Sequence, residues 1–222
     1  MNDEGQGLVD WAWVTGNLGL IAYYAWQNLY LALVPVLIGL AVSVPLGIAC
    51  ARWGWLYPPV LGVTSVLYAL PALALFALMI AWAGLTEAIV IVPLTLYSLA
   101  LLIPGVVDGL RAVPEPVRQS ATAMGFGPVR RLVQVELPLA IPVVIAGLRV
   151  ATVSSISLVS VGQLMGVGGL GYFFTDGEQR DFPTEVYVGI GLIVILAFAA
   201  DALLVLLRWS LTPWLRAREA AA

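Results

Sequence analysis

The sequence of 222 residues contains no histidine, no lysine and only one cysteine, Cys50. Without histidine the chain lacks the commonest metal ligand and general base, so we expect no catalytic residues and no metal site. A single cysteine excludes an intramolecular disulfide framework, and Cys/His and Ser/His/Asp nucleophilic machinery is excluded as well. Cys50 lies within an apolar run, where its ordinary role is that of a small buried side chain.

Charge is also scarce, because 10% of the residues are charged while 61% are hydrophobic and the mean hydropathy is +0.99. Ordinary soluble domains carry roughly 25% charged residues. The net charge of −3 points to no nucleic-acid partner. We therefore predict an all-α integral membrane protein with one membrane domain in a lipid bilayer. The N-terminus is acidic where a signal peptide is basic, so we expect it to belong to the mature chain.

Five apolar segments are long enough to cross a bilayer, since about 20 apolar residues span its hydrocarbon core. They cover residues 26–51, 56–81, 87–110, 139–165 and 186–207. Gly16, Asn17 and Gly19 interrupt the preceding residues 11–24, so we expect an N-terminal interfacial helix there, with a sixth span as the alternative. The predicted divisions are an extracytoplasmic segment (1–25), a transmembrane domain (26–210) containing a loop at 112–138, and a tail (211–222).

The placement of the arginines predicts the orientation of these spans. Nine of the ten arginines fall on the side of the 112–138 loop, and only Arg180 falls on the opposite side. Cytoplasmic segments of membrane proteins carry an excess of arginine and lysine. We therefore predict that the N-terminus is outside the cell, and that the loop and the C-terminus are cytoplasmic. The tryptophans lie near the predicted span ends, as an aromatic belt requires.

Two carboxylates lie within or beside the predicted spans: Asp201 is well inside the last span, and Asp108 lies near the inner end of the third. Charged residues within a membrane are expensive and are functional by default. For Asp201 we favour a structural partner on a neighbouring helix over a proton-transfer site. An intramembrane enzyme that uses Asp201 or Asp108 is one alternative function, and a structural membrane scaffold is another.

Small residues gather in the fourth predicted span and directly after it. The serines at 154, 155, 157 and 160 suit close helix packing and hydrogen bonding across a bundle better than nucleophilic catalysis. The run Gly166-Val167-Gly168-Gly169-Leu170-Gly171 lacks the Lys-Ser/Thr of a phosphate-binding loop. We interpret its four glycines, Gly166, Gly168, Gly169 and Gly171, as turn or gating residues that close the fourth helix.

The 112–138 loop is the most polar long segment, and prolines flank and interrupt it. The run from Gly125 to Pro128 predicts a break between two short helices. The first helix is too short and too poor in bulky apolar residues for a typical lipid-surface helix, so we favour its insertion into a groove on a partner protein. Its polar positions are Arg118, Gln119 and Thr122, and its small apolar face is Val117, Ala121 and Met124.

At this loop the sequence resembles the permease subunits of ATP-binding-cassette (ABC) importers. Their signature is Glu-Ala-Ala, three residues, Gly, nine residues and Ile-x-Leu-Pro. The same spacing is present here as Gln119-Ser120-Ala121, Gly125, Val135, Leu137 and Pro138, with glutamine in place of the acid. The stretches at 28–31, 44–48, 135–142, 146–149 and 166–171 are similar to the glycine betaine, carnitine and choline branch, so the resemblance covers about residues 28–210.

The resemblance implies a type I importer permease in a bacterial inner or plasma membrane. A second permease copy or a paralogue would complete the pathway, two ABC ATPase subunits would dock on the loops, and an extracytoplasmic binding protein would deliver the solute. This chain would bind no cofactor, since the partner ATPases would use ATP–Mg. Gly125 would provide the bend between the two loop helices, and Pro138 would begin the fourth span. The implied coupling residues are Arg118, Gln119, Ser120, Ala121, Met124, Gly125, Phe126 and Pro138.

The implied solute is an osmoprotectant such as glycine betaine, choline or carnitine, and a methionine or other amino-acid permease is the alternative. Quaternary ammonium groups bind in aromatic cages. Tyr68, Trp82 and Tyr97, together with Ser157, are therefore candidate pathway residues, against the simpler role of lipid contact or helix packing.

Overall fold

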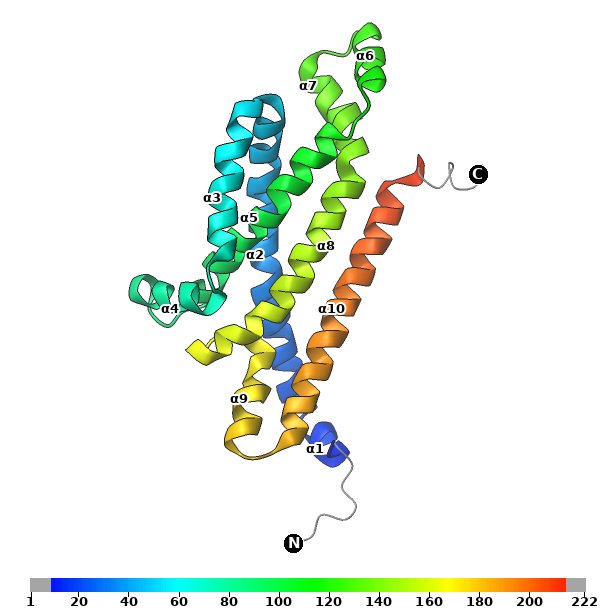
Figure 1. Cartoon of the computed structure of the whole chain (residues 1–222). Coiled ribbons are helices and arrows are strands. Elements are labelled where there is room, and N and C mark those ends of the chain that lie inside the picture. The colour runs from blue at the N-terminus through cyan, green and yellow to red at the C-terminus, as the bar shows by residue number, and fades with distance from the viewer. Residues whose placement is uncertain (1–8, 215–222) are drawn as a thin grey trace. The chain divides into compact units, whose positions relative to one another are not determined.

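The computed structural model describes residues 9–214, and every regular element in this range is helical. Figure 1 labels the helices and colours them along the chain from blue to red. Short 3₁₀ turns or a π-helical segment join several of them. The helices are α1 (Trp11–Gly16), α2 (Leu18–Arg52), α3 (Tyr57–Ala69), α4 (Ala72–Ala83), α5 (Ala88–Arg111), α6 (Glu115–Ala123), α7 (Pro128–Arg131), α8 (Leu137–Gly162), α9 (Tyr172–Gln179) and α10 (Pro183–Leu211).

Four helical runs of the described chain are long and apolar enough to cross a membrane. A fifth candidate is the pair Gly54–Ala69 and Ala72–Ala83, which is bent by 93°. These runs confirm the predicted all-α membrane fold, but a continuous span over 56–81 is wrong. The break falls at Leu70, because a residue before proline is driven out of the α region, and Pro71 has extended backbone angles. The four unbroken runs are Leu18–Arg52, Ala88–Arg111, Pro128–Met165 and Pro183–Leu211.

The N-terminal helix α1 is shorter than the predicted interfacial helix over 11–24. The Asp10 carboxylate caps it by accepting hydrogen bonds from the backbone N–H groups of Ala12 and Trp13. The helix ends at Asn17, and α2 then continues from Leu18 without interruption. The first long helix therefore begins at Leu18 rather than at Trp26, because a single glycine such as Gly19 weakens a helix without breaking it.

The chain divides into two compact units. Among the described residues, the first unit comprises 9–37, 70–95 and 152–199. Its core is Ile21, Leu170 and Phe173, and Trp13 and Tyr24 pack against it. This core joins the N-terminal part of α2 to the glycine-rich turn and α9.

The second unit comprises residues 38–69, 96–151 and 200–214. One of its clusters contains Cys50 with Ile103 and Val107, and Cys50 is fully buried, as predicted. A second cluster joins α5 to the start of α8 through Val106 and Ala140. This unit contains the whole 112–138 loop.

The loop leads directly into the following long helix. α7, a π-helical segment at Leu132–Glu136 and α8 follow one another without a break, so Pro138 lies inside a helical run instead of beginning one. A proline in a regular α-helix clashes with the carbonyl four residues earlier. The wider π-helical turn at Leu132–Glu136 makes room for the Pro138 ring. The helical run that begins at Pro128 can therefore continue through Pro138 into α8.

Candidate functional site

The first loop helix, α6, is held against its own unit by Arg118. Pro116 occupies the first turn of α6, where a missing N–H leaves no intrahelical bond unmade. The Arg118 side chain donates a hydrogen bond to the backbone carbonyl of Leu110 at the end of α5. The Nη1 atom of Arg118 lies 3.8 Å from a carboxylate oxygen of Glu115. Arg118 therefore fixes the position of α6 relative to α5, in addition to any contact with a partner.

A second arginine joins the two loop helices. The Arg131 side chain pairs with Glu136 at 2.7 Å and donates a hydrogen bond to the Thr122 hydroxyl at 3.1 Å. These contacts link α6, α7 and the π-helical segment. Side-chain contacts therefore hold the parts of the 112–138 loop together, and we call it the braced loop.

Gly125 lies at the bend between α6 and α7, as predicted. Its φ of +84° falls in the left-handed region, which is costly for residues with a side chain. The N–H of Gly125 donates to the Thr122 carbonyl, and the N–H of Phe126 donates to the Ala121 carbonyl. This pair of bonds is the Schellman motif that ends many helices with a glycine.

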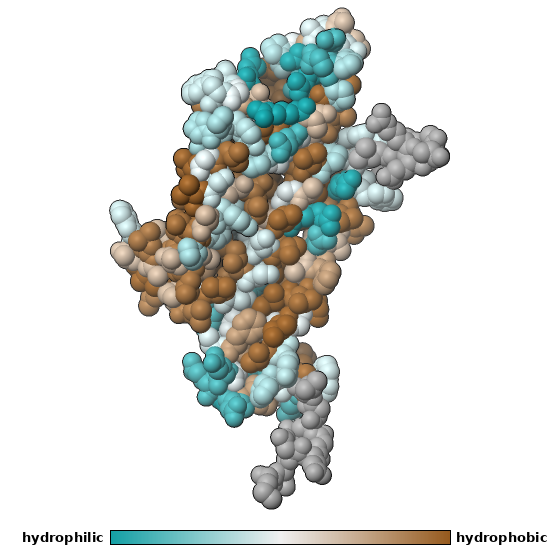
Figure 2. Space-filling model, in the orientation of Figure 1, coloured by the Kyte–Doolittle hydropathy of each residue, from teal (hydrophilic) through white to brown (hydrophobic). Residues whose placement is uncertain are grey.

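The exposed face of the loop differs from the expected one. Ala121 is only 2% exposed, because it packs against the loop's own unit, and its role in docking stays a prediction. Met124 and Val129 are highly exposed, and Gln119 and Ser120 also face outward. Figure 2 shows hydrophilic residues gathered around α6. A partner would therefore meet a polar surface with a few apolar side chains.

Phe126, another predicted coupling residue, is half-buried beneath an arginine. The Arg130 guanidinium lies 4.5 Å from the centre of the Phe126 ring, a cation–π contact. Arg130 also donates a hydrogen bond to Gln134 at 3.0 Å. Phe126 therefore helps to hold α7 against the glycine bend.

The glycine-rich turn of the first unit is fastened by Asn28, which the sequence reasoning missed. The Asn28 amide is fully buried. Its oxygen accepts from the Leu170 N–H at 3.3 Å, and its nitrogen donates to the Ile156 carbonyl at 3.2 Å. The signal that could have identified it is the pair of amide residues, Gln27 and Asn28, within a predicted membrane span.

Close backbone approach explains the glycine at 169. A Cβ on Gly169 would lie 2.6 Å from the Asn28 Cα atom, and its φ is +51°. Gly168 and Gly171 also pack too closely for a side chain, against Gln163 and Ser160, respectively. Gly166 has a positive φ but open space around it. The predicted turn is thus observed, and its role in gating stays a prediction.

The turn leads into α9, which the sequence analysis had left unassigned. Tyr172 stacks on Tyr24 with ring centres 4.3 Å apart. Burial raises the pKa of the Tyr172 phenol, and the carboxylate of Asp176 adds to this shift. Arg180 follows α9 and pairs with Asp176 and with the buried Glu185 of α10. The residues from Tyr172 to Arg180 are therefore an ordered connection between the turn and α10.

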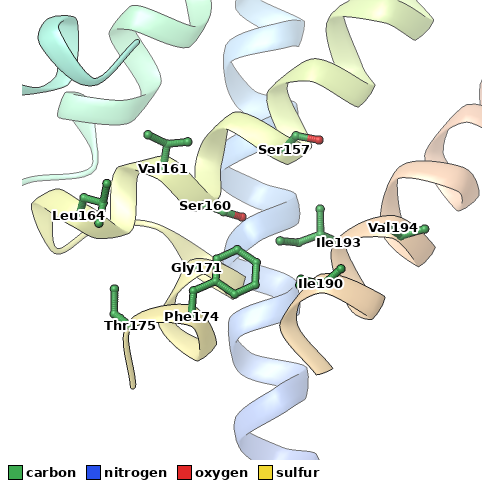
Figure 3. A pocket seen from close by; sticks show the side chains of 10 residues that line it. All are labelled: Ser157, Ser160, Val161, Leu164, Gly171, Phe174, Thr175, Ile190, Ile193 and Val194. Carbon is green, nitrogen blue, oxygen red and sulfur yellow. The ribbon is translucent and has the colours of Figure 1, made fainter. Parts of the chain in front are cut away.

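A cavity of about 400 Å³ opens beside this turn in the first unit. Figure 3 shows its lining side chains, which come from α8, α9, α10 and the turn. Ser157, a candidate pathway residue, lies on this cavity. The hydroxyl of Ser160 is buried and has no hydrogen-bond partner within the described chain. Phe174 contributes an aromatic ring to the same wall, so the cavity is mostly apolar, with three hydroxyl-bearing residues, Ser157, Ser160 and Thr175.

The other candidate pathway residues, Tyr68, Trp82 and Tyr97, are divided between the two units. Tyr68 and Tyr97 meet edge to face in the second unit, with ring centres 5.4 Å apart. Trp82 lies at the end of α4 in the first unit and is 86% exposed. The Tyr68–Tyr97 contact is consistent with helix packing, and the pathway role of all four residues stays a prediction.

Asp201 has the neighbouring-helix partner that we favoured. Its two carboxylate oxygens accept hydrogen bonds from Nε and Nη2 of Arg149 on α8, at 2.6 and 2.7 Å. A bidentate pair of this kind is geometrically specific. The pair also shows that Arg149 is a helix-joining residue of the second unit and not a free surface charge. Both oxygens are engaged by Arg149, which supports the structural role that we favoured for Asp201.

We compared the chain with protein-family models, curated proteins and solved structures. Residues 43–213 match the family model described as binding-protein-dependent transport system inner membrane component. The chain is 33% identical over 202 residues to the osmoprotectant import permease protein OsmW of Salmonella typhimurium, covering 89% of this chain and 94% of that protein. It is 34% identical over 188 residues to the carnitine transport permease protein OpuCB of Listeria monocytogenes, with coverages of 85% and 86%.

A third relative is the choline transport system permease protein OpuBB of Bacillus subtilis, 30% identical over 197 residues, with coverages of 89% and 91%. Among solved structures, the chain is similar to one from inward-facing conformations of the MetNI methionine ABC transporter. The TM-score is 0.74 at 21% identity, and the match covers 85% of this chain and 94% of that chain. At this level of identity the likeness shows the fold alone.

Proposed function

Because the chain belongs to the family of binding-protein-dependent transport system inner membrane components, we propose that it is the permease subunit of an ATP-driven importer for quaternary ammonium osmoprotectants. The relatives named for osmoprotectant, carnitine and choline transport, which match most of the chain, support this solute class. Glycine betaine, choline and carnitine share a trimethylammonium group. A methionine or other amino-acid permease is the alternative.

The observation that carries the mechanism is the unbroken helical run from Pro128 to Met165. Its N-terminal part belongs to the braced loop, and the rest is a candidate span. In our proposal two ATPase subunits dock on the 112–138 loops of two permease chains, which are copies or paralogues. ATP–Mg binding and hydrolysis in those ATPases then shift the loops, and the helical run transmits the shift to the membrane segment.

The arginine distribution supports an orientation with the loop and the C-terminus in the cytoplasm and the N-terminus outside. A binding protein would then deliver the solute at the side of the glycine-rich turn. The cavity beside this turn is a candidate contact for the solute, since its apolar wall and the Phe174 ring suit trimethylammonium methyl groups. Ser157, which is exposed and lines the cavity, would supply a hydroxyl group to the polar end of the solute.

The test is ATP-dependent uptake by proteoliposomes that contain the complete complex of permease, ATPase and binding protein. We expect uptake of labelled glycine betaine, choline or carnitine, and little uptake of methionine or proline. Preferred uptake of methionine would support the amino-acid alternative, and ATP-independent uptake would contradict the proposed mechanism.

The coupling role of the loop is tested separately with Gly125→Asp. A charged side chain at this left-handed position distorts the bend, so we expect membrane insertion to persist while uptake and binding-protein-stimulated ATP hydrolysis are lost. Gly16→Asp is the matched control, because Gly16 is predicted to lie outside the cell and has open space around it. Normal uptake by Gly125→Asp would refute the coupling role.

A further inference from the structure

A polar cavity of about 310 Å³ lies in the second unit, where α2 and α5 end beside α6 and α7. Four arginines line it: Arg52, Arg111, Arg118 and Arg131. The lining includes one carboxylate, Glu136. The arginines come from four separate helices, so the fold brings together charges that are distant in the sequence.

The carboxylate does not balance this charge. Glu136 is paired with Arg131 at 2.7 Å, which neutralises one of the four guanidinium groups. One further ion pair involves this group of arginines: the exposed Glu115 carboxylate lies 3.8 Å from Arg118. Exposed ion pairs of this length contribute little.

The three remaining guanidinium groups are incompletely bonded. The Arg52 side chain makes no hydrogen bond or ion pair within residues 9–214 of the structure. Arg111 stacks on the Tyr57 ring at 4.7 Å, a contact that leaves its N–H groups free to point elsewhere. Arg118 donates to the Leu110 carbonyl, but its Nε is buried and finds no acceptor in the described chain. These groups offer several N–H donors to one shared space.

Like charges that converge on one cavity repel each other, and an anion between them removes this repulsion. The planar guanidinium fork matches the oxygen spacing of a phosphate group and binds it through paired N–H donors. The cavity also borders Pro128, at the beginning of the long helical run, where the helix dipole favours negative charge.

We propose that this cavity binds a phosphate group through Arg52, Arg111 and Arg118. The phosphate comes either from the headgroup of an anionic lipid or from a free phosphate in solution. Bound in this position, it connects the ends of α2 and α5 to α6. This inference rests on neither the transported solute nor the docking of an ATPase.

The experiment measures ligand binding by thermophoresis of the purified full-length chain in an uncharged detergent. The probes are a short-chain phosphatidylglycerol, the corresponding phosphatidylcholine and inorganic phosphate. The main variant is Arg52→Gln, because the Arg52 side chain has no hydrogen bond or ion pair to lose within residues 9–214, and Arg52→Gln/Arg111→Gln extends it. Arg130→Gln is the matched control, since Arg130 belongs to the same loop region but does not line the cavity.

We expect Arg52→Gln to weaken binding by about five- to tenfold, the range between exposed and partly buried charge-assisted contacts. The double variant binds more weakly still, and Arg130→Gln binds like the wild type. Binding of phosphatidylglycerol without inorganic phosphate identifies a lipid headgroup, and comparable binding of inorganic phosphate identifies a soluble source. Absence of binding to the wild-type chain, or equal binding by Arg52→Gln and Arg130→Gln, would overturn the proposal and leave only solvated arginines.

Discussion

Replacing Asn28 with leucine tests how the glycine-rich turn is held in place. The substitution keeps the approximate size of the side chain but removes both of its hydrogen bonds. Asn28 is 0% exposed, so water does not readily replace the lost partner of the Leu170 N–H. The Ile156 carbonyl lies within α8, where it keeps its helical acceptor role.

The main cost is therefore one unsatisfied N–H group. A buried donor left without a partner costs about 1–3 kcal/mol. The Asn28 bonds are long, at 3.2 and 3.3 Å, so we expect a loss of about 2 kcal/mol, in the middle of that range. For a chain of this length, the corresponding drop in the unfolding midpoint is about 4–8 °C.

The assay is thermal unfolding of the purified chain, followed by tryptophan fluorescence. Gln27→Leu is the matched control, because it replaces the adjacent amide, which is only half-buried and makes no side-chain hydrogen bond in the described structure. Asn28→Asp gives a further comparison, since it keeps the acceptor for Leu170 but places a carboxylate oxygen against the Ile156 carbonyl. If Asn28→Leu and Gln27→Leu had the same midpoint, the proposed fastening of the turn would be refuted.

Three further predictions use the same unfolding assay. Gly169→Ala should destabilise the chain more than Gly166→Ala, because both glycines have positive φ but only Gly169 has the Asn28 backbone in the way; equal effects would rule out the close approach as the cause. Asp201→Asn should lower the midpoint, and Arg149→Asp/Asp201→Arg should recover part of the loss, whereas an unaffected single variant would show that the pair does not stabilise the chain. Ser160→Ala should leave stability unchanged or slightly higher, since its hydroxyl has no partner in the described chain; a clear loss would reveal a hydrogen bond not seen in the structure.

The long apolar helices could be predicted because their composition alone determines that they belong in a membrane. Their ends were harder to predict. Gly16, Asn17 and Gly19 resembled one extended interruption, yet only Asn17 breaks the helix. The bend at Leu70-Pro71 was missed because prolines are tolerated within membrane spans, and the sequence does not show whether neighbouring helices compensate for a given proline.

The 112–138 loop shows how much of the candidate site could be predicted from the sequence. Proline and glycine positions predicted two short helices and the bend at Gly125, since these residues act through local backbone geometry. Which face of α6 packs against its own unit depends on contacts with distant residues, and so the burial of Ala121 was not foreseen. The same reason applies to the partners of Arg118 and Asn28 and to the choice of Arg149 as the partner of Asp201.

The central claim, that the 112–138 loop docks on a cytoplasmic ATPase, is tested most directly by cysteine cross-linking in the assembled complex. The native Cys50 is fully buried, so a cysteine introduced at the exposed Met124 is the principal reactive thiol. Thr15→Cys, at an exposed position of α1, is the control on the predicted outer side. We predict that Met124→Cys cross-links to the ATPase subunit with a yield that changes on ATP addition, and that Thr15→Cys does not. Absence of a cross-link from Met124→Cys, or equal cross-linking from both positions, would contradict the claim.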